Sequence, residues 1–194
     1  MLPVTILIPV KDPYQSKTRL SGLLSSSERS TLAANMLMRV IQAAARSEVD
    51  DIVVAGSQLN SLKQLIEVQE FGSVRWVDVL GQDLNGDVEI ASAGIKNSGR
   101  AYIYIPSDVP FVTSNDIEDV IRSSEDGGIF VFVPSGSDGG TNAMLIPSPV
   151  PIFLVMAALT ARNATTFASS SDKSLLHSSS NRPYATGEPL PVVT

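Results

Sequence analysis

The sequence predicts an α/β fold of three layers, α/β/α, in which a mainly parallel sheet lies between helices. Strand-like and helix-like segments alternate through the first 150 residues, and this alternation requires crossover connections between parallel strands. The segments Asp50–Gly56 and Ala101–Ile105 are apolar on both faces, as expected for strands covered by helices on both sides. A content of 43% hydrophobic and 18% charged residues is typical of a globular chain.

Each element of this fold is predicted from a local pattern. Short apolar or β-branched runs predict six strands, at Val4–Val10, Asp50–Gly56, Val74–Val79, Ala101–Ile105, Ile129–Val133 and Asn142–Pro147. Apolar residues that recur every three or four positions predict four helices, at Glu28–Ala45, Leu59–Glu70, Leu84–Asn97 and Asn115–Ser124. Ser27 is the expected N-cap of the first helix, and Thr113 or Ser114 that of the last. Together these elements predict a Rossmann-like central sheet.

Length, charge and composition exclude several classes of protein. The 194 residues predict one main domain, at residues 1–150, followed by an atypical tail at 151–194. The absence of cysteine excludes disulfides and thiolate chemistry, and it fits a reducing cytoplasm. The net charge of −6 argues against nucleic-acid binding. No apolar run is long enough for a membrane span, and the first one lacks the basic leader of a secretory signal.

Ligands of open parallel sheets bind beyond the carboxyl ends of the strands. The loops at that edge are therefore the places to look for chemistry, and there are four of them: Pro9–Leu20, Gly81–Asp87, Pro106–Val112 and Pro134–Thr141.

The first of these loops gathers cations in an acidic protein. The stretch "IPVKDPYQSKTRLSG" carries Lys11, Lys17 and Arg19, but it contains neither GxxxxGK[ST] nor GxGxxG. The cations are suited to clamp a polyphosphate, with lysine acting as a point charge and arginine as a bidentate fork. The alternative is a solvated loop whose cations pair with surface carboxylates. The spacing alone leaves both interpretations open.

Asp108 in "PSDVPF" directly follows an apolar strand. A carboxylate at this position suits Mg²⁺, which takes one or two protein carboxylates together with phosphate oxygens and water. The alternative is a turn residue that bonds to its own backbone. We favour the metal ligand, because Pro106 and Pro110 already rigidify the turn.

Two further loops offer polar groups. In "GSDGGTNAM", Gly140 allows close backbone approach, while Thr141 and Asn142 add specific donors. The alternative for this segment is a flexible β-turn. In "GQDLNGD", Asn85 stands at a predicted helix start, where it suits an N-cap as well as a contact to a base or ribose.

Taken in order, "IPVK…KTRLSG", "DLNGDVEIA", "PSDVPFVTSNDI" and "DGGTNAMLI" resemble one family. This family is the phospholactate and phosphoenolpyruvate guanylyltransferases that help make the deazaflavin coenzyme F(420), within the glycosyltransferase-A-like nucleotidyltransferases. The resemblance covers about Leu2 to Pro147. It implies a fold of the nucleotide-diphospho-sugar transferase type. It also implies a Mg²⁺-dependent reaction in which GTP and a small phosphorylated three-carbon acid join with loss of pyrophosphate.

The resemblance also implies roles for individual residues. Lys11, Lys17 and Arg19 would hold the triphosphate, and Asn85 would lie near the nucleoside. Asp108 would hold Mg²⁺, and the substrate acid would meet Thr141 and its neighbours Gly140 and Asn142. Lys17, Arg19 and Asp108 would be the catalytic residues.

The chain departs from the family pattern after Pro151. The resemblance implies a Tyr/Phe-Gly-x-x-Ser segment and a later Asp-x-Asp that completes the metal site, and neither is present. Seven of the twelve residues from Ser169 to Ser180 are serine, which is typical of disordered or linker segments. We predict that this tail reflects a shifted reading frame that begins near Pro151–Val155, and that the activity is impaired.

Two other functions remain open. One is another nucleotidyltransferase of the same fold, such as a molybdopterin guanylyltransferase, although the first loop lacks that family's LxGGxSxRMG pattern. The other is a nucleotide-binding remnant without turnover, which the absent C-terminal carboxylates favour. The sequence does not decide which acid is used or whether the protein forms a homodimer.

Overall fold

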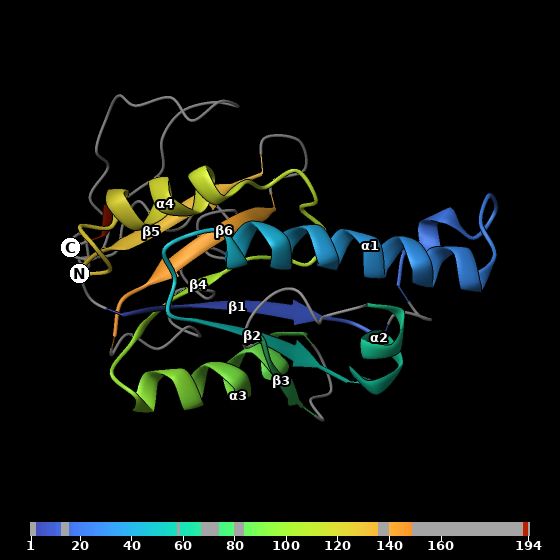
Figure 1. Cartoon of the computed structure of the whole chain (residues 1–194), viewed down its shortest axis with the longest axis horizontal. Helices are drawn as coiled ribbons and strands as arrows, with labels where there is room; N and C mark the ends of the chain where they lie inside the picture. Colours follow the sequence, from blue (N-terminus) through green and yellow to red (C-terminus); the bar gives the residue numbers. More distant parts are fainter. Residues whose placement is uncertain are drawn as a thin grey trace, which may run out of the picture.

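The computed structural model describes residues 3–12, 16–57, 59–66, 74–79, 84–135, 140–148 and 192–193. In this part of the chain a seven-stranded sheet lies between helices on both faces (Figure 1). The predicted three-layer α/β/α fold with a mainly parallel, Rossmann-like sheet is confirmed.

The sheet has the strand order β3-β2-β1-β4-β6-β5-β7. Its parallel part consists of β1 (Val4–Val10), β2 (Asp51–Gly56), β3 (Val74–Asp78) and β4 (Ala101–Tyr104). The antiparallel partners are β6 (Thr141–Ile146), which lies between β4 and β5 (Phe130–Pro134), and β7 (Val192–Val193), which pairs with β5. The connection from β5 to β6 is too short for a crossover helix, so β6 must run back along β5.

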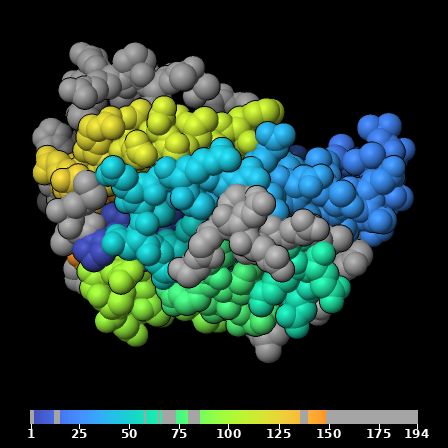
Figure 2. Space-filling model, viewed as in Figure 1, coloured from blue at the N-terminus to red at the C-terminus, as the bar shows by residue number. Residues whose placement is uncertain are grey.

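Four α-helices cover the sheet in the described part of the chain: α1 (Ser26–Ala45), α2 (Leu59–Leu65), α3 (Leu84–Asn97) and α4 (Ser114–Ser123). α1 and α4 lie side by side over one face, and α3 covers the other (Figures 1 and 2). Each face has its own buried apolar cluster, one shared with α1, α2 and α4 and the other with α3. None of the described helices is both long and apolar enough to cross a membrane.

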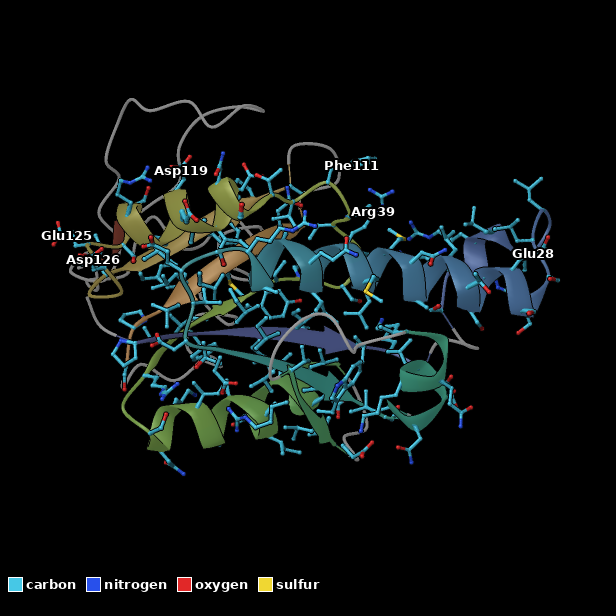
Figure 3. The ribbon with its side chains drawn as sticks, viewed as in Figure 1. Glu28, Arg39, Phe111, Asp119, Glu125 and Asp126 are labelled. Carbon is cyan, nitrogen blue, oxygen red and sulfur yellow. The ribbon has the colours of Figure 1, made fainter. Side chains whose placement is uncertain are left out.

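The start of α1 is fixed by a capping box. The Ser25 hydroxyl accepts a hydrogen bond from the Glu28 backbone N–H, and the Glu28 carboxylate accepts one from the Ser25 N–H at 2.8 Å. The predicted N-cap, Ser27, is therefore wrong by two positions. The reason is chemical, because only Ser25 has a glutamate three residues later and so completes the reciprocal pair. Glu28 lies on the exposed end of the helix (Figure 3).

The start of α4 follows the same rule and agrees with the prediction. Thr113 is the N-cap, and its hydroxyl accepts from the Asp116 N–H while the Asp116 carboxylate accepts from the Thr113 N–H. This box begins five residues after Asp108, so it anchors the far end of the loop that carries the candidate metal ligand.

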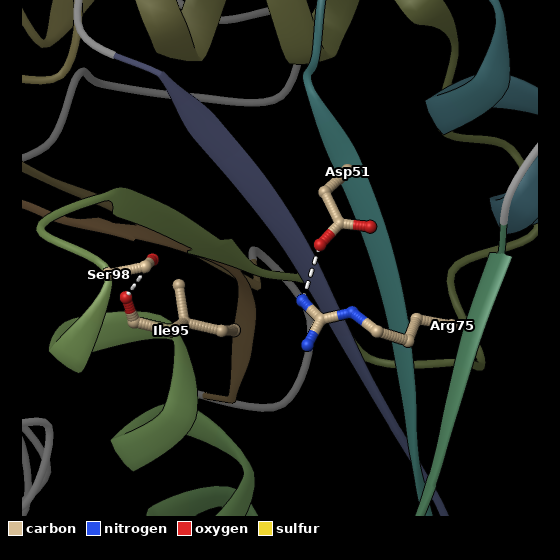
Figure 4. A network of polar contacts seen from close by, with 4 residues as sticks. All are labelled: Asp51, Arg75, Ile95 and Ser98. Carbon is tan, nitrogen blue, oxygen red and sulfur yellow. Dashed lines mark hydrogen bonds and ion pairs between the residues drawn. The ribbon is translucent and has the colours of Figure 1, made fainter.

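The edge of the sheet at β3 is held by an ion pair between Arg75 and Asp51 of β2 (Figure 4). At the end of α3, the Ser98 hydroxyl donates to the Ile95 carbonyl at 2.6 Å and so closes the last turn of the helix (Figure 4). Gly99 follows with φ of 72°, a left-handed conformation that ends the helix where the sequence predicted its end.

Gly56 ends β2 against the end of β1. A Cβ atom at Gly56 would lie 2.1 Å from the Val10 carbonyl oxygen, which real contacts do not allow. Only glycine therefore lets β1 keep this position, and the cation-bearing loop departs from β1 immediately after Val10.

Several predictions fall outside the described residues. α2 ends at Leu65, and the expected remainder of that helix to Glu70 lies largely in the undescribed range 67–73. Apart from β7, the tail at 151–194 also lies outside the described residues, so the predicted domain boundary and the predicted frame shift stay predictions.

Candidate functional site

The loops after β1 and β4 meet at the carboxyl edge of the sheet. These strands are parallel neighbours, with Leu7 opposite Tyr104, so both loops leave at the same edge. Between them, the central turns of α1 and helix α2 lies a cavity of about 630 Å³. It is lined by Pro9, Val10, Lys11, Ser16, Lys17, Thr18, Arg19, Leu20, Ala33, Met36, Leu37, Leu62, Tyr104, Pro106, Ser107 and Asp108.

The three cations of the first loop all line this cavity. Lys17 precedes a single 3-10 turn, η2 (Thr18–Leu20), and the Lys17 carbonyl accepts from the Leu20 N–H at 2.9 Å. The backbone of Lys17 is left-handed, with φ 52° and ψ 36°. That conformation costs a non-glycine residue on the order of 1 kcal/mol, so the loop holds Lys17 in a strained position facing the cavity.

Lys17 and Asp108, which both line the cavity, form an ion pair between residues 91 positions apart in the sequence. The Lys17 ammonium nitrogen lies 2.9 Å from an oxygen of Asp108. The lysine side chain is 25% exposed and the aspartate side chain 54% exposed. The sequence left open whether the loop cations pair with carboxylates. In the structure, Lys17 does pair with a carboxylate. Its partner, Asp108, is the residue that the sequence predicted to be a metal ligand.

Part of the cavity lining, which we call the apolar wall, consists of apolar side chains from two helices. Ala33, Met36 and Leu37 come from α1, and Leu62 comes from α2. A cavity lined by cations and by this apolar wall suits a ligand that has a strongly anionic part and a flat, weakly polar part. A nucleoside triphosphate has this character.

Asp108 is suited to hold a divalent cation. Its carboxylate is half-exposed at the end of β4, and it attracts the nearest ammonium group to 2.9 Å. The described residues contain no cluster of three or more histidine, aspartate or glutamate side chains that would bind a metal by themselves. Mg²⁺ does not need such a cluster where phosphate oxygens and water complete its shell. The donor set therefore fits a cation delivered with a polyphosphate.

Two buried tyrosines lie on β4 beneath this loop. Burial raises the pKa of the Tyr102 hydroxyl. Burial also raises the pKa of Tyr104, and the Asp108 carboxylate adds to the effect. Both hydroxyls therefore stay protonated in the folded protein at pH values where an unfolded chain begins to ionise them.

We expect the free energy of unfolding to fall as the pH rises above about 10, the pKa of an unfolded tyrosine. The unfolded chain then loses protons that the folded chain keeps, so each buried tyrosine lowers stability by up to about 1.4 kcal/mol per pH unit. Urea unfolding at pH 9, 10 and 11 measures this. The free energy of unfolding of the Tyr102→Phe variant should fall less steeply with pH than that of the wild type. Equal slopes of this free energy against pH would show that the Tyr102 hydroxyl does not contribute.

The remaining predicted residues lie elsewhere along the same edge. Gly140, Thr141 and Asn142 stand at the amino end of β6, which is antiparallel to β4 and so begins where β4 ends. They are not among the residues that line the cavity. The Asn142 amide donates to the Pro134 carbonyl at 3.4 Å, which ties β6 to β5.

Asn85 lies in the first turn of α3, which begins at Leu84, so it is not the N-cap, one of the two roles that the sequence left open for it. The position of its side chain lies outside what the structure describes.

Several lining residues were not predicted from the sequence. Ser107 adjoins Asp108, and Ser16 and Thr18 adjoin Lys17, so their positions beside the predicted residues were the available signal. Met36 and Leu62 carried no signal, because their spacing is that of ordinary core residues on a helix.

A family model described as "Guanylyl transferase CofC like" matches residues 4–154. The phosphoenolpyruvate guanylyltransferase of Thermobaculum terrenum is 24% identical over 75% of this chain and 62% of its own length. That of Chloroflexus aggregans is 28% identical over 76% of this chain and 75% of its own. The 2-phospho-L-lactate guanylyltransferase of Methanoregula boonei is 32% identical over 74% and 58%. The chain thus spans about three fifths of the length of most of these relatives.

Solved structures agree on the fold. A putative nucleotide-diphospho-sugar transferase from Desulfovibrio desulfuricans superposes with a TM-score of 0.61 at 18% identity, over 76% of this chain and 64% of the other. The 4-diphosphocytidyl-2C-methyl-D-erythritol synthase of Anaerococcus prevotii gives 0.52 at 9% identity, over 84% and 77%. The expected fold of the nucleotide-diphospho-sugar transferase type is confirmed.

Proposed function

The chain belongs to the CofC-like guanylyl transferase family, and from that premise we propose that it joins GTP to a small phosphorylated acid with release of pyrophosphate. The acid is phosphoenolpyruvate or 2-phospholactate, the substrates named for its relatives. The product is a guanylyl diphosphate diester that serves the biosynthesis of coenzyme F(420).

One observation carries this proposal. Lys11, Lys17 and Arg19 line the same cavity as Asp108. In a chain of net charge −6, cations gathered around one cavity favour a polyanionic ligand. Asp108 adds the carboxylate that a metal–triphosphate complex requires. The apolar wall of Ala33, Met36, Leu37 and Leu62 offers a surface for the guanosine.

The reaction requires no nucleophile from the protein. A phosphate oxygen of the acid attacks the α-phosphorus of GTP and forms a new P–O bond, while the bond from the α-phosphorus to the bridging oxygen breaks and pyrophosphate leaves. The chain's task is to align the two substrates and to stabilise the leaving group. Lys17 and Arg19, which line the cavity, would face the negative charge that accumulates on that leaving group and would lower the barrier by neutralising it.

Asp108 would hold Mg²⁺, which when bound supplies further neutralisation of the phosphate oxygens. Thr141, with Gly140 and Asn142, would contact the acid, since the start of β6 lies at the same edge of the sheet. Asn85 would meet the nucleoside from α3. We assign the nucleotidyltransferase domain to residues 1–150 and treat 151–194 as a tail, of which β7 pairs with β5 in the sheet. We place the reaction in the cytoplasm.

A second candidate function is nucleotide binding without turnover. The observation that favours it is the end of the family match at residue 154, which leaves the last 40 residues unmatched. Binding of GTP without acid-dependent release of pyrophosphate would identify this function. Release of pyrophosphate that depends on phosphoenolpyruvate or 2-phospholactate would support the guanylyltransferase.

A further inference from the structure

The Lys17 ammonium group forms an ion pair with the carboxylate of Asp108, the residue that is suited to hold a divalent cation. The two groups are 2.9 Å apart, within normal hydrogen-bonding distance for an ammonium and a carboxylate. We propose that Lys17 biases the order of binding: it lowers the affinity of Asp108 for a divalent cation alone and releases the carboxylate when a polyphosphate arrives. This inference rests on the proposed function in that the polyphosphate is the tail of the nucleotide.

Charge gives the first reason. A divalent cation at Asp108 would lie within a few ångströms of the Lys17 ammonium group, and the two like charges repel. The pair already neutralises the single carboxylate, so little attraction remains for a free cation. A triphosphate carries several negative charges and offers Lys17 more partners than one carboxylate does. Lys17 then exchanges partners, and Asp108 becomes available.

Exposure gives the second reason. The two side chains are 25% and 54% exposed, and ion pairs of this kind are worth only about 0–1 kcal/mol. The pair is therefore weak enough to exchange for a better partner, while it still competes with a cation in the absence of nucleotide.

The backbone gives the third reason. Lys17 is held at φ 52° and ψ 36° at the start of η2. Strain of this kind persists where surrounding contacts hold it and is common at switch segments. The bond from the Leu20 N–H to the Lys17 carbonyl holds one side of the residue and the ion pair holds the other. Loss of the ion pair removes one of the two restraints.

The test is binding of Mn²⁺, used as a paramagnetic probe, to the full chain without nucleotide. Electron paramagnetic resonance of the free ion gives the Kd. We expect Lys17→Met to bind Mn²⁺ roughly three- to fivefold more tightly than the wild type, the range that loss of a competing exposed pair allows. The matched control is Arg19→Met, which removes a cation from the same loop but leaves the Lys17–Asp108 pair, and it should change the Kd less than twofold.

Further variants make the result decisive. The double variant Lys17→Met with Asp108→Asn should not show the increased affinity for Mn²⁺, because the carboxylate that binds the ion is absent. Lys17→Gly, which tolerates the left-handed backbone, repeats the measurement if the methionine variant folds poorly. A non-hydrolysable GTP analogue should raise the Mn²⁺ affinity of the wild type more than that of Lys17→Met.

A change of less than twofold in Lys17→Met and Lys17→Gly would overturn the inference. An equal gain in Mn²⁺ affinity in Arg19→Met would also overturn it, since removal of any positive charge from the loop would then explain the effect. The measurement without nucleotide does not depend on guanylyl transfer, so its failure is separate from failure of the proposed function, which only the release of pyrophosphate tests.

Discussion

Replacement of Asp108 by asparagine is expected to lower acid-dependent release of pyrophosphate by roughly a thousandfold, the upper range for loss of one preorganised electrostatic group. Asparagine keeps the shape of the side chain but removes the charge that attracts Mg²⁺. The fold should remain intact, because the Asp108 side chain is 54% exposed and its ion pair with Lys17 stabilises by about 1 kcal/mol at most. Pyrophosphate release and thermal unfolding, measured on the same sample, check both statements.

The matched control is Asp119→Asn. Asp119 is a half-exposed aspartate on α4 (Figure 3) that also pairs with a cation, Arg122, but it is not among the residues that line the cavity. Its substitution should leave turnover unchanged. Wild-type activity in Asp108→Asn would remove Asp108 from the mechanism.

Replacement of the loop cations Lys17 and Arg19 by alanine is expected to weaken the binding of GTP more than that of GMP. Lys17→Ala and Arg19→Ala should each weaken GTP binding roughly tenfold or more, because charge-assisted hydrogen bonds contribute about 1.5–3 kcal/mol each. Binding of GMP should weaken much less, since the β- and γ-phosphates that these residues hold are absent from it. Calorimetric titration with both nucleotides measures the difference.

Arg39→Ala serves as the control for this series. Arg39 is an exposed cation on α1 outside the cavity lining (Figure 3), so its loss tests whether net charge alone explains an effect. Equal losses for GTP and GMP in the loop variants would mean that Lys17 and Arg19 are structural or contact only the α-phosphate.

The sequence predicted the central elements well, because the physics that determines them is local. The helix over 84–97 and the strand over 4–10 were placed at the observed residues. Apolar spacing specifies the buried face of the helix, and a short apolar, β-branched run specifies the strand, which is buried at every position. The predicted N-cap of α1 was wrong by two residues, because Ser27 was chosen for its residue type alone, whereas the capping box requires a glutamate three residues after the cap, as Ser25 has in Glu28. The direction of β6 depends on the length of the connection from β5 and on pairing with β4, and neither is encoded by the strand itself.

The candidate site was predicted only in part. Four polar residues of the predicted set, Lys11, Lys17, Arg19 and Asp108, line one cavity because parallel neighbouring strands bring their loops together. The left-handed Lys17 and its pairing with Asp108 depend on tertiary contacts between residues 91 positions apart. The apolar wall from Met36 and Leu62 could not be predicted, because a residue that lines a cavity and one that fills a core have the same helical spacing.

The most direct test of the central claim is the release of pyrophosphate from GTP in the presence of Mg²⁺. The full chain is incubated with GTP and either phosphoenolpyruvate or 2-phospholactate, with the Asp108→Asn variant and a sample without acid as controls. We predict release of pyrophosphate that requires one of the two acids and the wild-type carboxylate, with one guanylyl diphosphate diester formed per pyrophosphate. GTP that binds in the cavity without acid-dependent release of pyrophosphate from either substrate would contradict the proposed guanylyltransferase activity.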